Sequence, residues 1–322
     1  MSVSDPAKAP VGNASAAPAS LWRRLIAFTL DTTLLGAIGY SVGMMLFDLV
    51  VDLGLGARLI GLALALAYFG LSDSRLTKGR SFGKRLLGIA VVGPDGAPLS
   101  IGTATLRALV VMAPIILNDF DLDDISPIVT GLWSFLVIGV GASLLYLLLF
   151  NRTTRQSLHD LMVGSMVISV GTPRPAAHPL WIGHRIVVGV LCAVSLAFGL
   201  LIPSMVQSSG RLSELLVVRT ALMTRPGLRD VGVSRVWSTE TGRPTKDSIV
   251  VTAYVRRWPA DPEAEARDIA GQVLKEFPDL VGTRTLVVKV ALTFNLGIAN
   301  YSKQQQIETS AAAWPKIETR GT

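Results

Sequence analysis

The chain has 322 residues, of which half are apolar and only 16% are charged, and its formal net charge is +7. A typical soluble domain carries about 25% charged residues, so much of this chain need not face water. The composition excludes collagen, extended disorder and a disulfide-stapled secreted module, since Cys192 is the single cysteine. The charged residues are concentrated late, with 28 of the 53 after residue 205. The sequence therefore predicts an integral membrane protein with a soluble C-terminal part.

Residues 1–20 are rich in Ala, Pro and Ser, which is typical of a disordered lead-in. The apolar run that follows is too long for a signal peptide, whose apolar core has about 7–15 residues. A helix of about 20 apolar residues can cross a hydrocarbon core of about 30 Å. We expect about five membrane helices, of which the third is weakened by Arg107. They cover residues 25–47, 53–71, 101–117, 127–150 and 181–203.

The loops between the predicted helices differ in charge. Basic residues precede the first helix and fill the loops after the second and fourth, whereas the loops after the first and third carry aspartates. Short basic loops stay in the cytoplasm, and these loops share one side only if residues 101–117 cross the bilayer. We therefore expect a multi-pass protein of the cell membrane, in a bacterial inner membrane, with its N-terminus cytoplasmic and residues 206–322 extracytoplasmic.

Residues 206–322 alternate between strand and helix patterns. Ile249, Val251, Ala253 and Val255 fall on one face of a strand, and the run 263–277 has apolar residues at helical spacing. The fold class that we predict is an α-helical membrane bundle, the membrane domain covering residues 21–170, plus a small soluble α+β domain. In the α+β domain we expect helices at 212–223 and 263–277, strands at 231–238, 248–257 and 285–294, and a loose tail over the last dozen residues.

Two ionisable residues fall inside predicted membrane helices. Asp31 lies six residues into the first helix, and Arg107 lies six residues into the third. A charge near the centre of a membrane helix costs about 2.5–3.5 kcal/mol, so each should find a partner. If both helices begin on the cytoplasmic side, the depths match and an Asp31–Arg107 pair is expected. Such a pair is either a clamp between helices or part of an ion or solute path; the remaining alternative is that Arg107 extends to the interface.

Three short blocks in this region resemble a known family. Arg24-x-x-Ala27-x-x-x-Asp31 is similar to the opening of the RDD family, named for one arginine and two aspartates. The block from Ser81 to Gly88, which contains Gly83, Lys84 and Arg85, resembles its Gly-Lys-Arg-Leu-Leu-Gly segment. The block from Arg155 to Gly164 resembles the closing His-Asp segment, with His159 and Asp160. Ser81-Phe82 and Ser165 depart from the family pattern of Thr-Pro and Thr.

The residues of these blocks predict an arrangement. Gly88–Val92 and Ser165–Val170 are strand-like runs, and Pro94-Asp95-Gly96 is a turn, so a small cytoplasmic sheet is expected. Asp160 would then lie near the end of the first helix, where Arg24 emerges. We predict an Arg24–Asp160 ion pair; the alternative is that both residues are solvated separately.

Other functional classes find little support in the residues. The three histidines lack Cys/His ligand spacing, so neither a metal nor another cofactor is expected. The C-terminal part contains no His or Cys and hence no common nucleophile–base pair, so we do not expect an enzyme. Its excess positive charge lacks the dense basic stripe with stacking aromatics of a nucleic-acid surface, and no nucleic-acid partner is expected.

Two functions remain open. The resemblance implies a membrane protein whose role is unproven and for which transport of an ion or small solute has been suggested. The ionisable residues predict that such a transporter would use Asp31, with Arg24, Arg107 and Asp160 as the charges that pair along the path. The alternative is a non-enzymatic membrane anchor or envelope factor whose C-terminal domain binds a protein or cell-envelope partner. Five helices are few for a complete carrier, so a transporter would need to form a homo-oligomer in the lipid bilayer.

Overall fold

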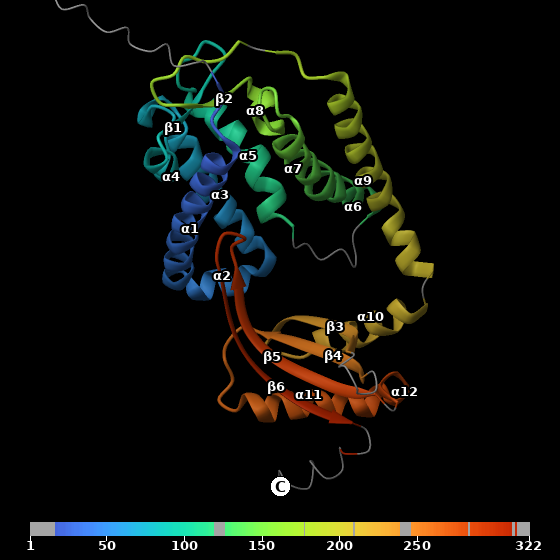
Figure 1. The fold of residues 1–322 in the computed structure, drawn as a ribbon. Coiled ribbons are helices and arrows are strands. Elements are labelled where there is room, and N and C mark those ends of the chain that lie inside the picture. The colour runs from blue at the N-terminus through green and yellow to red at the C-terminus, as the bar shows by residue number, and fades with distance from the viewer. Residues whose placement is uncertain are drawn as a thin grey trace, which may run out of the picture. The chain divides into compact units, whose positions relative to one another are not determined.

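The computed structural model describes residues 17–118, 126–176, 178–208, 210–238, 246–282, 284–310 and 313 (Figure 1). The chain divides into two compact units, and the division runs through the long helices. The first unit combines Met1–Leu34, Ala65–Met112 and Val140–Leu191. The second combines Leu35–Leu64, Ala113–Gly139 and Cys192–Thr322. The predicted aspartate loop after the third helix, most of the lead-in and most of the tail lie outside the described residues.

All five ranges predicted as membrane helices are helical. Among the described residues, four helices are long and apolar enough to cross a membrane. They are α1 (Leu21–Met45), the run of α2 (Phe47–Leu53), η1 (Gly54–Gly56) and α3 (Ala57–Ser72), the run of α6 (Pro127–Ser134), η3 (Phe135–Val140) and α7 (Gly141–Phe150), and α9 (Ile182–Ser208).

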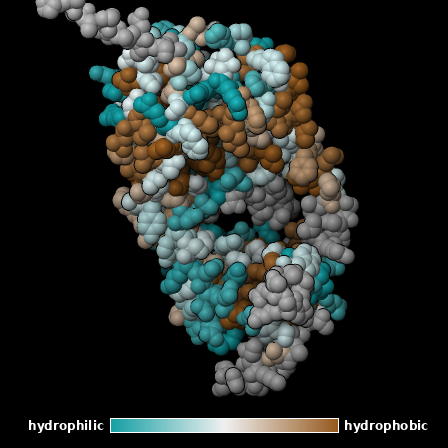
Figure 2. Space-filling model, viewed as in Figure 1, coloured by the Kyte–Doolittle hydropathy of each residue, from teal (hydrophilic) through white to brown (hydrophobic). Residues whose placement is uncertain are grey.

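The third predicted helix is α5 (Ile101–Ile116), which is apolar but shorter than the other four. At 1.5 Å per residue it is about 24 Å long, slightly less than a hydrocarbon core of about 30 Å. Large apolar side chains, among them Ile186 and Val194 of α9, are exposed, and hydrophobic residues form a band across the helical part in Figure 2. Exposed apolar side chains are suited to contact with lipid, because the hydrocarbon core of a bilayer is itself apolar.

The small sheet predicted from the family blocks is present in the first unit. Strands β1 (Ile89–Val92) and β2 (Met166–Ser169) pair antiparallel, with Ile89 opposite Ser169. The predicted turn follows β1, where the amide of Gly96 donates to the carbonyl of Gly93. The lead-in ends earlier than we expected, because Pro18 forms a bridge with Ile168 and the amide of Ala19 donates to the carbonyl of Val167.

The C-terminal domain is built on a four-stranded sheet in the order β3-β4-β5-β6. The inner strands β4 and β5 are parallel, and both outer pairs are antiparallel. Two helices pack on this sheet, α10 against β3 and α11 against β5 and β6. The elements are α10 (Gly210–Met223), β3 (Leu228–Ser238), β4 (Lys246–Val255), α11 (Pro262–Glu276), α12 (Pro278–Val281), β5 (Thr285–Asn295) and β6 (Asn300–Ser310).

The apolar core of this domain confirms the alternating pattern of the predicted strands. Ile249, Val251, Ala253 and Val255 of β4 are all buried, and so is Ile269 of α11. Burial of a large aliphatic side chain contributes about 1.5–3 kcal/mol, so this alternation is the main source of stability in the domain. Strand β6 was not predicted, because its run from Lys303 to Gln306 is polar on both faces and lies at the edge of the sheet.

Within the second unit, the hairpin between β5 and β6 packs against the helices. Phe294 and Leu296 are buried in the same apolar cluster as Val50 and Val51 of α2. Gly61 of α3 permits the contact, since a Cβ there would lie 1.8 Å from the carbonyl oxygen of Leu296. The apolar core of the C-terminal domain therefore extends to residues of α2 and the start of α3.

Candidate functional site in the helical region

Asp31 lies deeper in α1 than we predicted. The helix begins at Leu21 rather than at Leu25, so ten residues, or about 15 Å, separate its start from Asp31. The residue is completely buried. A buried carboxylate needs hydrogen-bond donors around it, because moving an unpaired charge out of water is costly.

The donors to Asp31 are all uncharged groups. Its Oδ1 accepts from the hydroxyl of Tyr68 at 2.8 Å and from the backbone N–H of Gly83 at 2.8 Å, and its Oδ2 accepts from the hydroxyl of Ser81. Tyr68 comes from α3, whereas Ser81 and Gly83 come from the start of α4 (Phe82–Leu86). Three donors satisfy the carboxylate without any cation in direct contact among the described residues.

The glycine of the Gly-Lys-Arg block is required by this arrangement. Gly83 sits against the backbone of α1, and a Cβ on it would lie 2.2 Å from the carbonyl oxygen of Ala27. No side chain fits at that distance, so only glycine lets α4 approach α1 closely enough for its N–H to reach Asp31. The residues of this block, predicted as a loop, form the short helix α4.

Lys84 and Arg107 meet at a carboxylate that we did not predict. Asp73, just after α3, accepts from Lys84 Nζ at 2.6 Å and from Arg107 Nη1 at 2.7 Å. All three residues are buried. The sequence does contain a signal for Asp73, since it is a lone acid at the end of an apolar helix that precedes a run of basic residues.

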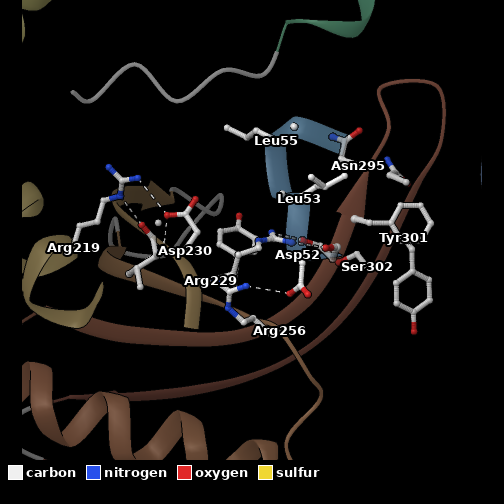
Figure 3. Close-up of a pocket in the computed structure, with 18 of the residues that line it drawn as sticks. Asp52, Leu53, Leu55, Arg219, Arg229, Asp230, Arg256, Asn295, Tyr301 and Ser302 are labelled. Atoms are coloured by element: carbon white, nitrogen blue, oxygen red, sulfur yellow. Dashed lines mark hydrogen bonds and ion pairs between the residues drawn. The ribbon is translucent and has the colours of Figure 1, made fainter. Parts of the chain in front are cut away.

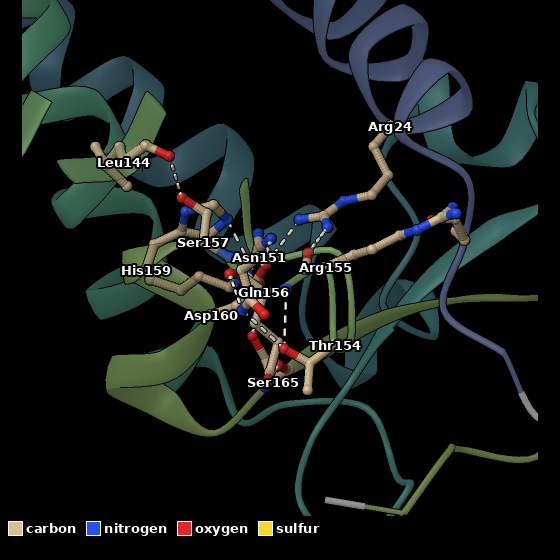
Figure 4. A network of polar contacts seen from close by, with 12 residues as sticks. Arg24, Leu144, Asn151, Thr154, Arg155, Gln156, Ser157, His159, Asp160 and Ser165 are labelled. Atoms are coloured by element: carbon tan, nitrogen blue, oxygen red, sulfur yellow. Dashed lines mark hydrogen bonds and ion pairs between the residues drawn. The ribbon is translucent and has the colours of Figure 1, made fainter. Parts of the chain in front are cut away.

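The predicted ion pair between Arg24 and Asp160 is confirmed. Arg24 Nη2 donates to Asp160 Oδ2 at 2.7 Å (Figure 4). Arg107 Nη2 lies 2.9 Å from Asp160 Oδ1. Asp160 is also part of a capping box at the N-terminus of α8 (Leu158–Val163), together with Ser157. The hydroxyl of Ser165 donates to Oδ1 at 2.9 Å. Both oxygens of Asp160 therefore face guanidinium groups.

The predicted Asp31–Arg107 pair is wrong. Arg107 donates to Asp73 and Asp160, whereas Asp31 accepts from uncharged donors such as Tyr68. Matching depth suggested the pair, but it depended on Asp31 being six residues into the helix, whereas it is ten. Arg107 is buried and does not extend to the interface.

The contacts of these residues form one unbroken polar chain. Lys84 Nζ donates to the hydroxyl of Ser81 at 3.2 Å, which in turn donates to Asp31. The chain thus runs from Asp31 in α1 through Lys84, Asp73 and Arg107 to Asp160. Three carboxylates and three cations, Arg24, Lys84 and Arg107, meet in it, so the formal charges balance.

Backbone carbonyls and side-chain amides hold the Arg24 end of this chain in place. Arg24 also donates to the carbonyl of Arg155, whose loop is closed by Asn151 and Gln156 (Figure 4). Gln156 Nε2 donates to the carbonyl of Ser165 at 2.7 Å, which ties this loop to the start of β2. Because the side-chain amides of Asn151 and Gln156 have partners, the loop that accepts from Arg24 is held in one position.

Two residues of the predicted loop motif lie outside the polar chain. Arg85 is exposed and donates to the carbonyl of Arg80. Gly88 has a φ of 60°, which favours glycine, and connects α4 to β1. Arg23, which was not predicted as a site residue, donates to the carbonyls of Leu87 and Gly88 and so joins α1 to this connection.

His159 is neutral at neutral pH. Burial lowers the pKa of His159 to about 3, and the attraction of Asp160 opposes this shift without overcoming it. For Asp160, burial alone would raise the pKa, but the adjacent His159, Arg107 and Arg24 hold the pKa of that carboxyl well below its usual range. The Asp160 carboxylate is therefore charged, while its neighbour His159 is not. Among the described residues, no group of three His, Cys, Asp or Glu is placed to hold a metal ion.

The comparison with known families agrees with this geometry. Residues 18–164 match the sequence model of the RDD family. We call these matched residues the RDD region. Arg24, Asp31 and Asp160, the residues that resemble the arginine and two aspartates of the family pattern, are linked by one polar chain in the structure. Neither the comparison with curated proteins nor the comparison with solved structures found a match.

Proposed function

We propose that the RDD region carries a proton or a small monovalent cation across the membrane, with Asp31 as the binding group. The observation that supports this is the difference between Asp31 and the other two carboxylates of the polar chain. Asp73 and Asp160 each contact cations, whereas the donors to Asp31 in the described part of the chain are Tyr68, Ser81 and Gly83. Ionisable residues inside membrane helices are by default functional candidates.

The chemistry of the Asp31 site suits reversible binding. A proton on the carboxylate keeps the contacts with Tyr68 and Ser81, because hydroxyl groups can both donate and accept. A small cation would find the carboxylate and two hydroxyl oxygens together, the hard oxygen ligands that such ions prefer. Lys84 contacts the Ser81 hydroxyl that binds Asp31, and it also contacts Asp73. A change in the charge of Asp31 would therefore act on Asp73 and the rest of the polar chain through Lys84.

The proposal includes a topology and an assembly. Basic loops favour a cytoplasmic N-terminus and an extracytoplasmic C-terminal domain in a bacterial inner membrane. We also propose that the chain forms a homo-oligomer, since four long helices and the shorter α5 are few for a complete carrier. A periplasmic reporter such as alkaline phosphatase fused after residue 322 is expected to be active, and a cytoplasmic signal would contradict the topology.

Flux through reconstituted vesicles tests the transport function. We expect purified protein in liposomes to dissipate an imposed proton or Na⁺ gradient, and Asp31→Asn to abolish this flux. Asp48→Asn is the matched control, because it is the same substitution at an exposed position on α2. Flux no greater than in empty vesicles, or equal flux from Asp31→Asn, would contradict transport through Asp31.

A second candidate function is supported by the hairpin between β5 and β6. Its residues Phe294 and Leu296 are buried together with Val50 and Val51 of α2, so the helices hold the C-terminal domain firmly. Such a hold is what a non-enzymatic anchor needs if the domain binds a protein or cell-envelope partner. Val236 and Trp237, exposed on the edge strand β3, are the apolar residues best placed for such a partner.

Photo-crosslinking in cells tests the anchoring function. A photoreactive residue at Trp237 in the full-length chain is expected to give one adduct of higher mass, whereas the same residue at Arg267 on α11 gives none. No adduct from either position would leave the anchoring function without support and favour transport.

A further inference from the structure

The C-terminal domain contains a cavity of about 1050 Å³ that is separate from the polar chain of the RDD region. Its walls come from the corner between α2 and η1, from α10 and from all four strands (Figure 3). Sites for small molecules usually occupy about 300–1,000 Å³. The cavity is therefore large enough for an organic ligand rather than for a single inorganic ion.

The charged side chains of the cavity favour an anion. Three arginines and two aspartates line it, which leaves one positive charge in excess. Arg219 pairs with Asp230 at 3.3 Å, and Arg256 pairs with Asp52 at 3.1 Å. The Arg256 pair lies at the rim, where both side chains are more than half exposed. Exposed pairs are worth only about 0–1 kcal/mol, so Arg256 can turn to a ligand at little cost.

Arg229 is the cation that these pairs do not neutralise. Its guanidinium donates to the carbonyls of Val51 and Thr293 at 2.8 and 2.9 Å and to the hydroxyl of Thr293. It also lies 5.6 Å from the ring centre of Tyr254. No carboxylate of the described residues is within ion-pair distance of it. Partial burial lowers the pKa of Arg229, as expected for a cation that lacks a direct counter-ion.

One wall of the cavity belongs to an apolar helix. The corner residues Leu53 and Leu55 are part of the stretch Phe47–Ser72, which is long and apolar enough to cross a membrane, and both side chains are exposed. Arg229 binds the backbone of this same stretch at Val51. A fixed cation and exposed leucines thus meet where an apolar helix ends and the C-terminal domain begins.

We propose that this cavity binds an amphiphile with one anionic phosphate group, held by Arg229 and Arg256, with its apolar part against Leu53 and Leu55. A guanidinium matches phosphate oxygens with paired N–H donors, and the single excess charge suits a headgroup of charge −1. The leucines account for the apolar part, which a free phosphate compound lacks. The proposal does not depend on transport through Asp31.

Three soluble probes separate the sources of the phosphate group. Purified full-length protein in a non-ionic detergent is titrated with dihexanoylphosphatidylglycerol, dihexanoylphosphatidylcholine or glycerol 3-phosphate, and binding is followed by calorimetry. We expect the anionic lipid to bind at least about tenfold more tightly than the other two, which corresponds to about 1.4 kcal/mol. Equal binding of glycerol 3-phosphate would overturn the apolar part of the proposal, and equal binding of the zwitterionic lipid would overturn the anionic part.

Variants identify the cations. Arg229→Gln and Arg256→Glu are each expected to weaken binding of the anionic lipid at least about tenfold. Arg256→Glu covers the case in which Arg229→Gln unfolds the domain, because Arg256 holds no backbone group among the described contacts. Arg235→Gln, an exchange of an arginine outside the cavity, is the matched control. Unchanged affinity in Arg256→Glu or in a folded Arg229→Gln, or equal loss in Arg235→Gln, would overturn the assignment.

Discussion

The RDD region and the C-terminal domain use charge in opposite ways. In the RDD region, Arg107 is buried and forms ion pairs with two buried carboxylates, Asp73 and Asp160. In the C-terminal domain the core is apolar, and ion pairs such as Arg256–Asp52 lie at the surface. A buried pair is costly to leave incomplete, whereas an exposed pair can exchange partners. The comparison therefore assigns structural roles to most buried charges and leaves the exposed ones available for ligands.

The same comparison separates two aspartates within the RDD region. Each oxygen of Asp160 faces a guanidinium, so an amide in its place would point its NH₂ group at another donor. Asp31 faces hydroxyls and one N–H, and an amide there can accept from Tyr68 and Gly83 while donating to Ser81. Isosteric replacement should thus disturb the fold at Asp160 and leave it nearly intact at Asp31.

The largest effect is expected from Asp160→Asn. Removing one partner of a buried ion pair leaves uncompensated charge, here on Arg24 and Arg107, and costs about 3–5 kcal/mol. Thermal unfolding in detergent, measured against the exposed Asp48→Asn, checks this. A melting temperature like that of the unchanged protein would mean that the cluster is not a structural clamp.

Core truncation in the C-terminal domain is the next test. Ile249 is completely buried in β4, so Ile249→Ala should lower the free energy of unfolding by about 2–5 kcal/mol through lost burial and a cavity. Val236→Ala, an exposed change on β3, is the control. Because this core includes residues of α2, the loss should also appear as faster proteolysis between α1 and α3. Proteolysis confined to the C-terminal domain would show that the two do not share a core.

A pH-dependent effect is expected from His159. Between about pH 6.5 and pH 3 the unfolded chain binds a proton on this imidazole and the folded protein does not, so stability falls as the pH is lowered through that window. His159→Asn should reduce the slope by up to about 1.4 kcal/mol per pH unit. Denaturant titrations at pH 6.5, 5.5 and 4.5 measure it, with His178→Asn as the control, since His178 is exposed. An unchanged slope would contradict burial of a neutral imidazole.

The smallest effect is expected from Asp247→Asn in the C-terminal domain. Asp247 contacts Arg235 and Arg284, but all three side chains are about a quarter exposed. The change should cost at most about 1 kcal/mol and shrink further at high salt. A loss as large as that of Asp160→Asn would remove the contrast between the two regions.

Periodicity and motif order predicted much of this arrangement. Apolar runs located the helices, alternation located β4 and β5, and the order of the family blocks brought Arg24 to Asp160. These features depend on local pattern or on neighbours that the blocks themselves contain. Asp73 was missed although it is a lone acid before a run of basic residues, because that local pattern does not indicate that Lys84 and Arg107 both contact it.

Features that depend on tertiary contact could not be predicted in this way. Helix α1 begins at Leu21, one turn before the predicted start. Asp31 is therefore one turn further from the start of its helix than predicted, and its depth no longer matches that of Arg107. The polar edge strand β6 forms because β5 offers it a partner, as its own residues do not alternate. The approach of Leu296 to Gly61 joins residues far apart in the sequence, and neither residue alone indicates it.

The most direct measurement is an infrared difference spectrum of the reconstituted protein, recorded between high and low pH and with and without Na⁺. If Asp31 binds the transported ion, one carboxyl band should change in the unaltered protein and in Asp48→Asn, and should be missing from Asp31→Asn. Identical difference spectra for the unaltered protein and Asp31→Asn would contradict Asp31 as the binding group.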